Sequence, residues 1–272
     1  MTATEKALDT LARKAAAVAA MLADPEHNRP ALIGFLAESV TYHKGGKIEG
    51  LFSLDVASRQ CRFCESMQEA AKANPAIICR FCYARNEHES ATRRHEITGN
   101  ILSTVRIRPD EAAYIGAKAH KLRFDSDGEL LNDIHADNLI AIAKANPSST
   151  DSIWTKDADT LEGAFNRAGG KPANLICGIS SPQINIPAKP REWANFIFTV
   201  YTPEGLKRAL ARGEYSCNGR KCMECNYRCY DREANKEGPV YIAELLRKPH
   251  NMKKADFEAL CALIDSITLK ED

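Results

Sequence analysis

The sequence predicts an α/β protein of parallel strand–helix repeats, folded as a full or partial (β/α) barrel with cysteine-rich metal-binding loops and extra N-terminal helices. Three observations lead to this class. Short apolar runs alternate with amphipathic segments of helix length through the middle of the chain. Two separate groups of four cysteines interrupt this alternation. An alanine- and leucine-rich stretch of helical periodicity precedes it, at residues 3–23.

Local signals justify each element in order. A second helix is expected at residues 30–40, and a short strand at 51–54 leads into the first cysteines. Proline at position 109 suits the first turn of a helix over 109–120. The other expected strands are residues 121–124, 152–155, 174–179 and 195–202, and the other expected helices are 84–98, 132–145, 159–168, 203–212 and 254–267. We therefore divide the chain into an N-terminal helical segment (1–44), an α/β metal-binding domain (45–232) and a C-terminal helical segment (233–272).

The composition of the chain limits the classes of protein to which it can belong. Lysines and arginines number 37 against 36 acidic residues, so no global cationic field would draw the chain onto nucleic acid. Nucleic acid is therefore an alternative partner that the net charge does not favour. The expected substrate is an unidentified small molecule or macromolecule. The longest apolar stretch, residues 15–22, is too short to span a bilayer, and the N-terminus lacks a signal-peptide profile. We expect a cytoplasmic protein with no membrane partner. Its ten cysteines argue for metal ligation rather than for a disulfide framework.

The first cysteine group consists of two Cys-x2-Cys pairs. Cys61 and Cys64 are followed, after fourteen residues, by Cys79 and Cys82. A two-residue spacer lets both thiolates of a pair reach one metal, and two pairs complete a four-sulfur shell. This spacing does not choose between zinc and an iron–sulfur cluster.

The second cysteine group has a compact, irregular spacing. It reads Cys217-x4-Cys222-x2-Cys225-x3-Cys229 and contains the cations Arg220, Lys221 and Arg228. Such a run is more typical of a cluster than of paired zinc knuckles. A [4Fe–4S] cluster is therefore the expected cofactor, with zinc as the alternative.

Acidic residues follow the predicted strand at 121–124. Asp125, Asp127 and Glu129 alternate, so they could face one side and serve a hard cation or acid–base chemistry. The alternative is a solvated turn around Gly128. His135 has no metal-ligand spacing, and we expect a surface or capping role for it.

Several segments together carry a resemblance to known families. They are residues 78–84 (Ile-Cys-Arg-Phe-Cys-Tyr-Ala), 122–129 (Leu-Arg-Phe-Asp-Ser-Asp-Gly-Glu), 153–156 (Ile-Trp-Thr-Lys), 180–182 (Ser-Ser-Pro), 198–201 (Phe-Thr-Val-Tyr) and the cysteine run 217–230. With these, roughly residues 45–232 resemble the phage gene product 88 family. This resemblance points to a site rather than to an activity.

The same features are distantly similar to radical S-adenosylmethionine enzymes, in which a Gly-Gly-Glu motif follows the second strand of the barrel. The resemblance implies that Asp127, Gly128 and Glu129 bind the cofactor, with Glu129 and the Gly128 backbone on the methionine amino group. Ser180 and Ser181 follow another predicted strand, and we expect them to line the same cofactor site.

The cysteine spacing departs from that family's pattern. The usual Cys-x3-Cys-x2-Cys run is replaced by the two pairs 61/64 and 79/82, where Cys82, with Tyr83 beside it, would close the cluster loop. If all four cysteines bind one centre, no iron is open to S-adenosylmethionine and the centre is structural or transfers electrons. If one does not bind, radical chemistry remains. The rival expectation is a zinc-stabilised module that contacts nucleic acid or a protein.

Overall fold

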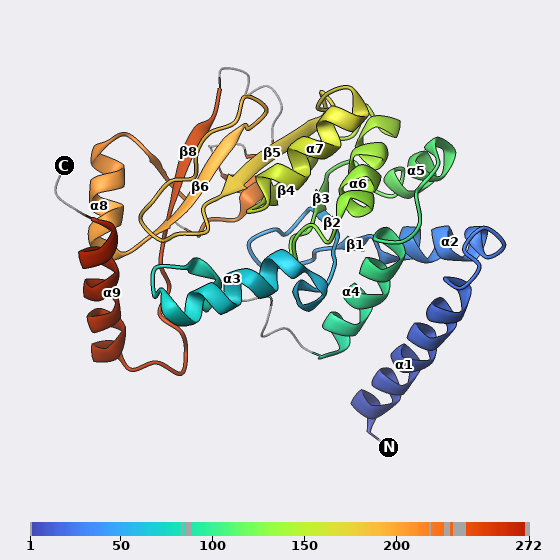
Figure 1. Ribbon diagram of the computed structural model, residues 1–272, viewed down its shortest axis with the longest axis horizontal. Helices are drawn as coiled ribbons and strands as arrows, with labels where there is room; N and C mark the ends of the chain where they lie inside the picture. The colour runs from blue at the N-terminus through green and yellow to red at the C-terminus, as the bar shows by residue number, and fades with distance from the viewer. Residues whose placement is uncertain are drawn as a thin grey trace.

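The structure, a computed structural model, describes residues 2–82, 84, 89–217, 219–225, 229–230 and 238–269. Within these residues the chain has a mixed α/β fold around one eight-stranded, mostly parallel sheet (Figure 1). This confirms the α/β class.

The strands follow one another across the sheet almost in chain order. Their order is β1-β2-β3-β4-β5-β6-β8-β7. The β1–β2 pair is antiparallel, and the other neighbouring pairs are parallel. Because the neighbours are parallel, their carboxyl ends share one edge of the sheet, the edge where ligand sites of such folds lie. The strands are β1 (Thr41–Tyr42), β2 (Phe52–Leu54), β3 (Leu122–Phe124), β4 (Asp151–Thr155), β5 (Leu175–Ser180), β6 (Phe196–Tyr201), β7 (Tyr215–Ser216) and β8 (Val240–Leu245).

Side-chain caps fix several helix starts. The Asn132 side chain accepts a hydrogen bond from the backbone of His135 at the start of α6, and Asp157 does the same for Thr160 at the start of α7. No helix in the described part of the chain is long and apolar enough to cross a membrane. The α-helices of that part are α1 (Ala3–Met21), α2 (Arg29–Ser39), α3 (Arg62–Ala73), α4 (Glu89–Leu102), α5 (Pro109–Gly116), α6 (Asp133–Ala145), α7 (Ala158–Ala168), α8 (Pro203–Ala211) and α9 (Lys254–Thr268).

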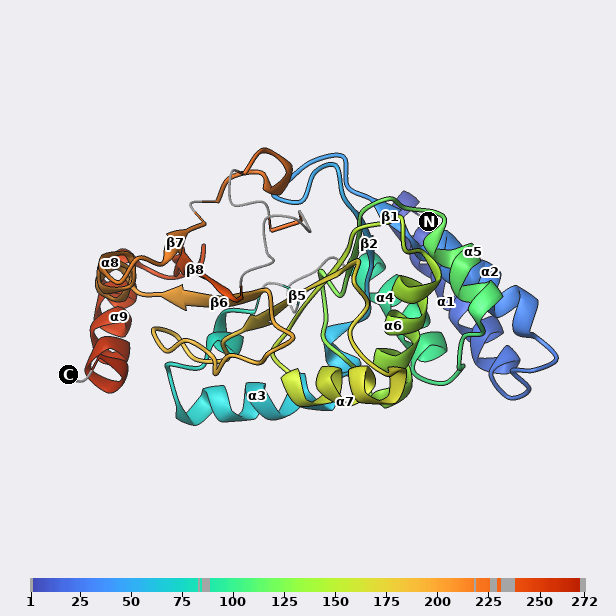
Figure 2. The same ribbon diagram turned by 90° about the horizontal axis from the view of Figure 1, so that it is seen from above.

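Different elements pack on the two faces of the sheet. Alternate strand residues, among them Leu122, Ile153 and Leu175, enter the main apolar core beneath α6 and α7; we call this side the helix face. Residues between them, such as Arg123 and Trp154, point to the other side. There, loops that include residues 43–51 and 219–225 lie over the sheet (Figure 2). We call this side the loop face.

The N-terminal helices belong to the same core. Leu32 and Leu36 of α2 are fully buried in one cluster with Leu54 of β2 and Phe124 of β3. Helix α1 packs on α4, and α2 packs on α4 and α5. Segment 1–44 therefore shares its apolar core with the α/β part.

Four described strands and α-helices were not predicted from the sequence: the two-residue strands β1 and β7, helix α3 and strand β8. Helix α3 occupies the spacer between the two cysteine pairs, where no helix was predicted. Strand β8 lies between β6 and β7 and pairs in parallel with both. It belongs to a C-terminal segment that was expected to be helical. The prediction for residues 233–272 was thus incomplete, because this segment supplies an internal strand as well as α9.

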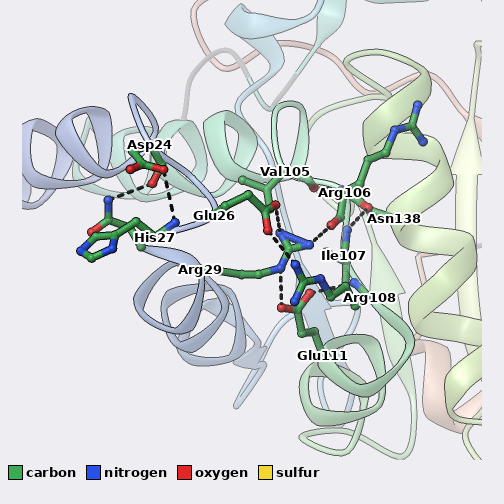
Figure 3. Close-up of polar contacts among 11 residues, drawn as sticks. Asp24, Glu26, His27, Arg29, Val105, Arg106, Ile107, Arg108, Glu111 and Asn138 are labelled. Carbon is green, nitrogen blue, oxygen red and sulfur yellow. Dashed lines mark hydrogen bonds and ion pairs between the residues drawn. The ribbon is translucent and has the colours of Figure 1, made fainter.

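A buried arginine joins the N-terminal helices to the rest of the protein (Figure 3). The Nε of Arg29 lies 2.8 Å from Glu111 Oε1 of α5, and its Nη2 donates to the Arg106 carbonyl over 2.5 Å. Its Nη1 donates to the exposed carboxylate of Glu26 over 3.0 Å. These contacts hold the start of α2 against α5.

We expect Arg29→Met to lower the free energy of unfolding by about 1.5–2 kcal/mol, since the variant keeps the apolar stem but loses hydrogen bonds of a charged group. Urea unfolding followed by circular dichroism measures this. Glu26→Gln is the matched control and should change stability by less than about 0.5 kcal/mol, because Glu26 is two-thirds exposed. Equal effects of both substitutions would contradict this role of Arg29.

Candidate metal centres and carboxyl-edge site

The first cysteine pair lies at the start of α3, just beyond the carboxyl end of β2. Cys61 is the helix N-cap, and its fully buried Sγ accepts a hydrogen bond from the Cys64 backbone at 3.3 Å. The Cys61 thiol also lies 3.2 Å from the Leu130 carbonyl. Hydrogen bonding with the Cys64 side chain lowers the pKa of Cys61 against the effect of burial, and the same contact raises the pKa of Cys64. The two thiols therefore face each other.

The second pair folds back beside the middle and second half of α3. Cys79 lies in a 3₁₀ turn (Ile78–Phe81), and its carbonyl accepts hydrogen bonds from the Gln68 side chain and, at 3.2 Å, from the Cys82 backbone. The Ile78 backbone donates to the Pro182 carbonyl over 2.9 Å, which fixes this turn to the chain after β5. Tyr83 lies outside the described residues.

The segment after β3 is held against the segment after β2. Oδ1 of Asp55 accepts from the Ser126 backbone at 2.7 Å and from the Asp127 backbone at 3.2 Å. Gly128 has a φ of +112°, and a Cβ built on it would lie 2.2 Å from the Val56 carbonyl oxygen. Only glycine allows this approach. The Asp-Gly-Glu segment therefore lies at the carboxyl edge, next to the loop that leads to Cys61.

Glu129 turns toward the end of β4. It is buried, and its carboxylate accepts from the Thr155 hydroxyl and, at 2.8 Å, from the Lys156 backbone. Burial raises its pKa, while the Lys156 charge and these hydrogen bonds oppose the rise. Cys64 lies close enough to both Glu129 and Lys156 for their charges to affect its pKa. The structure thus brings the first cysteine pair and Glu129 together.

Asp125 and His135 form a second buried pair at this edge. Within the described structure, neither carboxylate oxygen of Asp125 has a hydrogen-bond partner. The Nε2 of His135 has none either. His135 Nε2 lies 3.7 Å from Asp125 Oδ1. His135 Nδ1 accepts from the Leu131 backbone at 3.2 Å, so the expected capping role is confirmed. The expected surface position was wrong, because the side chain is fully buried and burial lowers its pKa to about 3.

The two serines differ in their environment. Ser180 is the last residue of β5 and is half-buried. The Ser181 hydroxyl donates to the Ile186 carbonyl at 2.5 Å and accepts from the Gln183 backbone at 3.1 Å. Ser181 therefore shapes its own turn at the carboxyl edge.

The second cysteine group lies on the loop face. Cys217 follows β7, and its backbone donates to the Ala243 carbonyl of β8 at 2.8 Å. Cys217 and Cys229 pack on three apolar residues of the central strands, Ile176, Phe196 and Ile242. Arg228 lies outside the described residues.

The four thiols of this group interact electrostatically. Burial, followed by the charges of Cys225, Cys217 and Cys222, raises the pKa of Cys229 to about 12. Burial also raises the pKa of Cys222; the charges of Lys47 and Arg123 oppose the rise, and those of Cys217 and Cys225 add to it. The four sulfur atoms therefore share one region.

An aromatic and cationic layer lies beside these thiols. Arg123 Nη1 donates to the Tyr230 hydroxyl over 2.6 Å, and the guanidinium carbon lies 4.4 Å from the Trp154 ring centroid. Tyr230 also stacks on Trp154, with centroids 6.3 Å apart and planes at 13°. Lys47 lies 5.9 Å from the ring of Phe198, the next aromatic residue of the layer.

The donor chemistry suits a thiolate-bound metal. Thiols on one loop, next to Lys47 and Arg123, are the environment that an anionic metal–thiolate group requires. Within the described ranges no three His, Cys, Asp or Glu side chains lie close enough to share a metal ion. Binding would therefore have to draw the thiols of each group together.

Sequence reasoning missed the partners that come from distant segments. Lys47 and Arg123 were assigned no role, although Arg123 stands between two apolar residues of a predicted strand and so had to face away from the core. Nothing in the sequence places Lys47 near residue 217.

The fold and these side chains define a mixed α/β protein with a predominantly parallel sheet and two cysteine-rich regions, one at its carboxyl edge and one on its loop face. Comparisons with protein-family models, with curated proteins and with solved structures found no match for the chain.

Proposed function

We propose that this protein is an iron–sulfur enzyme that resembles the radical S-adenosylmethionine class and acts on a substrate still to be identified. The observation that carries the proposal is the second cysteine group: four cysteines on the loop face of a parallel sheet, beside the cations Lys47 and Arg123. Four thiolates and nearby positive charges suit a cluster with net negative charge.

The strand order supports a partial (β/α) barrel. Strands β2, β3, β4, β5, β6 and β8 are parallel neighbours in chain order. Sequential parallel order is the order of a (β/α) barrel. As described, the sheet has edge strands β1 and β7 and is open between them. An open, partial barrel is therefore the form that we propose.

Each region has a proposed role. The group Cys217, Cys222, Cys225 and Cys229 would hold a [4Fe–4S] cluster, and the group Cys61, Cys64, Cys79 and Cys82 would hold the other metal centre. When bound, a cluster supplies single electrons to the site. At the carboxyl edge, residues 127–129 with Ser180 and Ser181 would bind S-adenosylmethionine. The Gly128 backbone and the Glu129 carboxylate are placed there by their contacts with Val56 and Lys156.

A zinc-stabilised binding module is the second candidate. The turn at Cys61, with its backbone-to-sulfur hydrogen bond from Cys64, suits a paired zinc site as well as an iron site. In this case both groups are structural, and the exposed arginines and aromatic residues contact nucleic acid or a protein partner. The balanced charge of the chain does not favour nucleic acid.

Metal analysis tests the two candidates. The protein is expressed and purified without oxygen, and its iron, sulfide, zinc and visible absorption are measured. We expect iron and sulfide in the wild type, with a loss of about half or more in Cys222→Ser/Cys225→Ser. Cys261→Ala is the matched control, since Cys261 packs in a separate apolar cluster and should leave the metal content unchanged.

The other outcomes are equally decisive. Zinc without iron or sulfide, and a fold that is kept only with metal bound, would favour the binding module. A protein without metal under these conditions would exclude both. If iron is present, titration with S-adenosylmethionine and its cleavage by the reduced protein test the cofactor assignment. Glu129→Gln should then weaken that binding, and unchanged binding would remove Glu129 from the site.

A further inference from the structure

Lys47 reaches the second cysteine group from a loop far away in the sequence. Its Nζ lies 2.9 and 3.0 Å from the two carboxylate oxygens of Glu244 on β8, the residue after Ala243, whose carbonyl accepts from the Cys217 backbone. The Lys47 carbonyl accepts from the Cys222 backbone at 2.7 Å. The Lys47 backbone therefore contacts the cysteine group directly, and its ammonium group is held on β8 beside the residue that pairs with Cys217.

Arg123 approaches the same thiols from the sheet. The residue is buried on β3, and its guanidinium is held by the Tyr230 hydroxyl and the Trp154 ring. Tyr230 directly follows Cys229, so this hydrogen bond of 2.6 Å holds the Arg123 guanidinium beside the end of the cysteine group. Two cations from separate elements thus lie at the same cysteine group.

The cations next to the cysteines in sequence are placed differently. Arg220 is exposed. Lys221 is half-exposed, and its Nζ lies 2.9 Å from Glu49. Water screens exposed charges such as these, whereas charges inside the protein act more strongly. Lys47 and Arg123 are therefore the cations best placed to offset the negative charge of a thiolate-bound metal.

We propose that Lys47 and Arg123 are the charge partners of the second metal centre, which stabilise its anionic thiolate form and raise its reduction potential. Glu244 opposes them, because its carboxylate lies on Lys47 and adds a negative charge on the same side. This inference rests on the proposed iron–sulfur function and specifies how the chain tunes it.

The reduction potential of the iron-loaded protein tests this role. Anaerobic titration, followed by absorbance and electron paramagnetic resonance, is run on the wild type, Lys47→Met, Lys47→Arg and Glu244→Gln. We expect Lys47→Met to disfavour one-electron reduction at least tenfold, which is a shift of about 59 mV to lower potential. Lys47→Arg should restore the potential, and Glu244→Gln should raise it. The opposite signs identify a charge effect, because loss of a structural contact would not move the two variants in opposite directions.

Lys44→Met is the matched control, since Lys44 is exposed on the same loop. An unchanged potential in Lys47→Met and Glu244→Gln, relative to Lys44→Met, would overturn the inference while the cluster itself remained. Absence of iron would instead overturn the proposed function. If the centre holds zinc, its release to a chelator is measured: faster release from Lys47→Met than from Lys44→Met supports the charge role, and equal rates overturn it.

Discussion

Replacing Gly128 by alanine is expected to lower the free energy of unfolding by about 3 kcal/mol or more. The backbone at Gly128 has a φ of +112°, which side chains rarely adopt. The new Cβ would also lie 2.2 Å from the Val56 carbonyl oxygen and 2.9 Å from its Cγ2. The backbone contact cannot be relieved by a rotamer change, so the segments after β2 and β3 would have to separate. Urea unfolding at 25 °C measures the loss.

Gly169→Ala is the matched control. Gly169 also has a positive φ, +74°, at the end of α7, but nothing lies within 4 Å of its Cβ position. The positive φ alone should therefore lower the free energy of unfolding of Gly169→Ala by about 1 kcal/mol. If Gly128→Ala cost no more than Gly169→Ala, the close approach of the two segments would be contradicted. If iron is present, Gly128→Ala should also weaken the binding of S-adenosylmethionine, because the segment carrying Glu129 would move.

The sequence predicted the parallel core well because its signals are local. The apolar run Leu-Ile-Cys-Gly-Ile of β5 is short and bounded by polar residues, and such runs are typical of strands buried on both faces. Helices α6 and α7 are bounded by Asn132, Asp157 and Gly169, which carry the usual start and stop signals. Local chemistry and the final fold agree in these elements.

Helix α3 and strand β8 were missed for physical reasons. In α3 the cysteines attract a metal-site interpretation, and the first of them serves as the N-cap in place of the usual serine or aspartate. In β8 the six residues Val240–Leu245 form a run too short to separate strand from helix by periodicity. Its partner β6 lies about forty residues earlier, so the pairing that stabilises β8 is invisible locally.

The candidate site was predictable as a list of residue types but not as an arrangement. Cysteine spacing and the Asp-Gly-Glu segment could be identified directly. The contact between Glu129 and Thr155 depends on the neighbouring positions of β3 and β4, and that between Lys47 and Glu244 depends on the path of a loop. Such contacts follow from topology, which no local pattern encodes.

Asp125→Asn is expected to stabilise the protein by roughly 2–3 kcal/mol at pH 8. Asp125 is 4% exposed, and neither of its carboxylate oxygens has a hydrogen-bond partner among the described residues. Burial raises its pKa well above the ordinary value of 3.8, the charges of Glu129, Asp55 and Cys61 add to the rise, and Arg123 opposes it. Asparagine also tolerates the φ of +49° found there.

The stabilisation expected for Asp125→Asn should increase with pH. An acid whose pKa is raised on folding gives up its proton more readily in the unfolded chain, so its ionisation costs stability as the pH rises from 3.8 through the raised pKa. The variant and the wild type should therefore differ little at pH 4, with a gap in unfolding free energy that widens toward pH 8. His135, whose pKa burial lowers to about 3, destabilises both proteins below pH 6.5 and largely cancels in the difference. A gap independent of pH would contradict a buried, ionisable Asp125. A gain in stability of Asp125→Asn that grows with pH would show that the protein keeps an ionisable carboxyl group at this edge at a cost in stability. Such a cost is typical of residues that serve chemistry rather than folding.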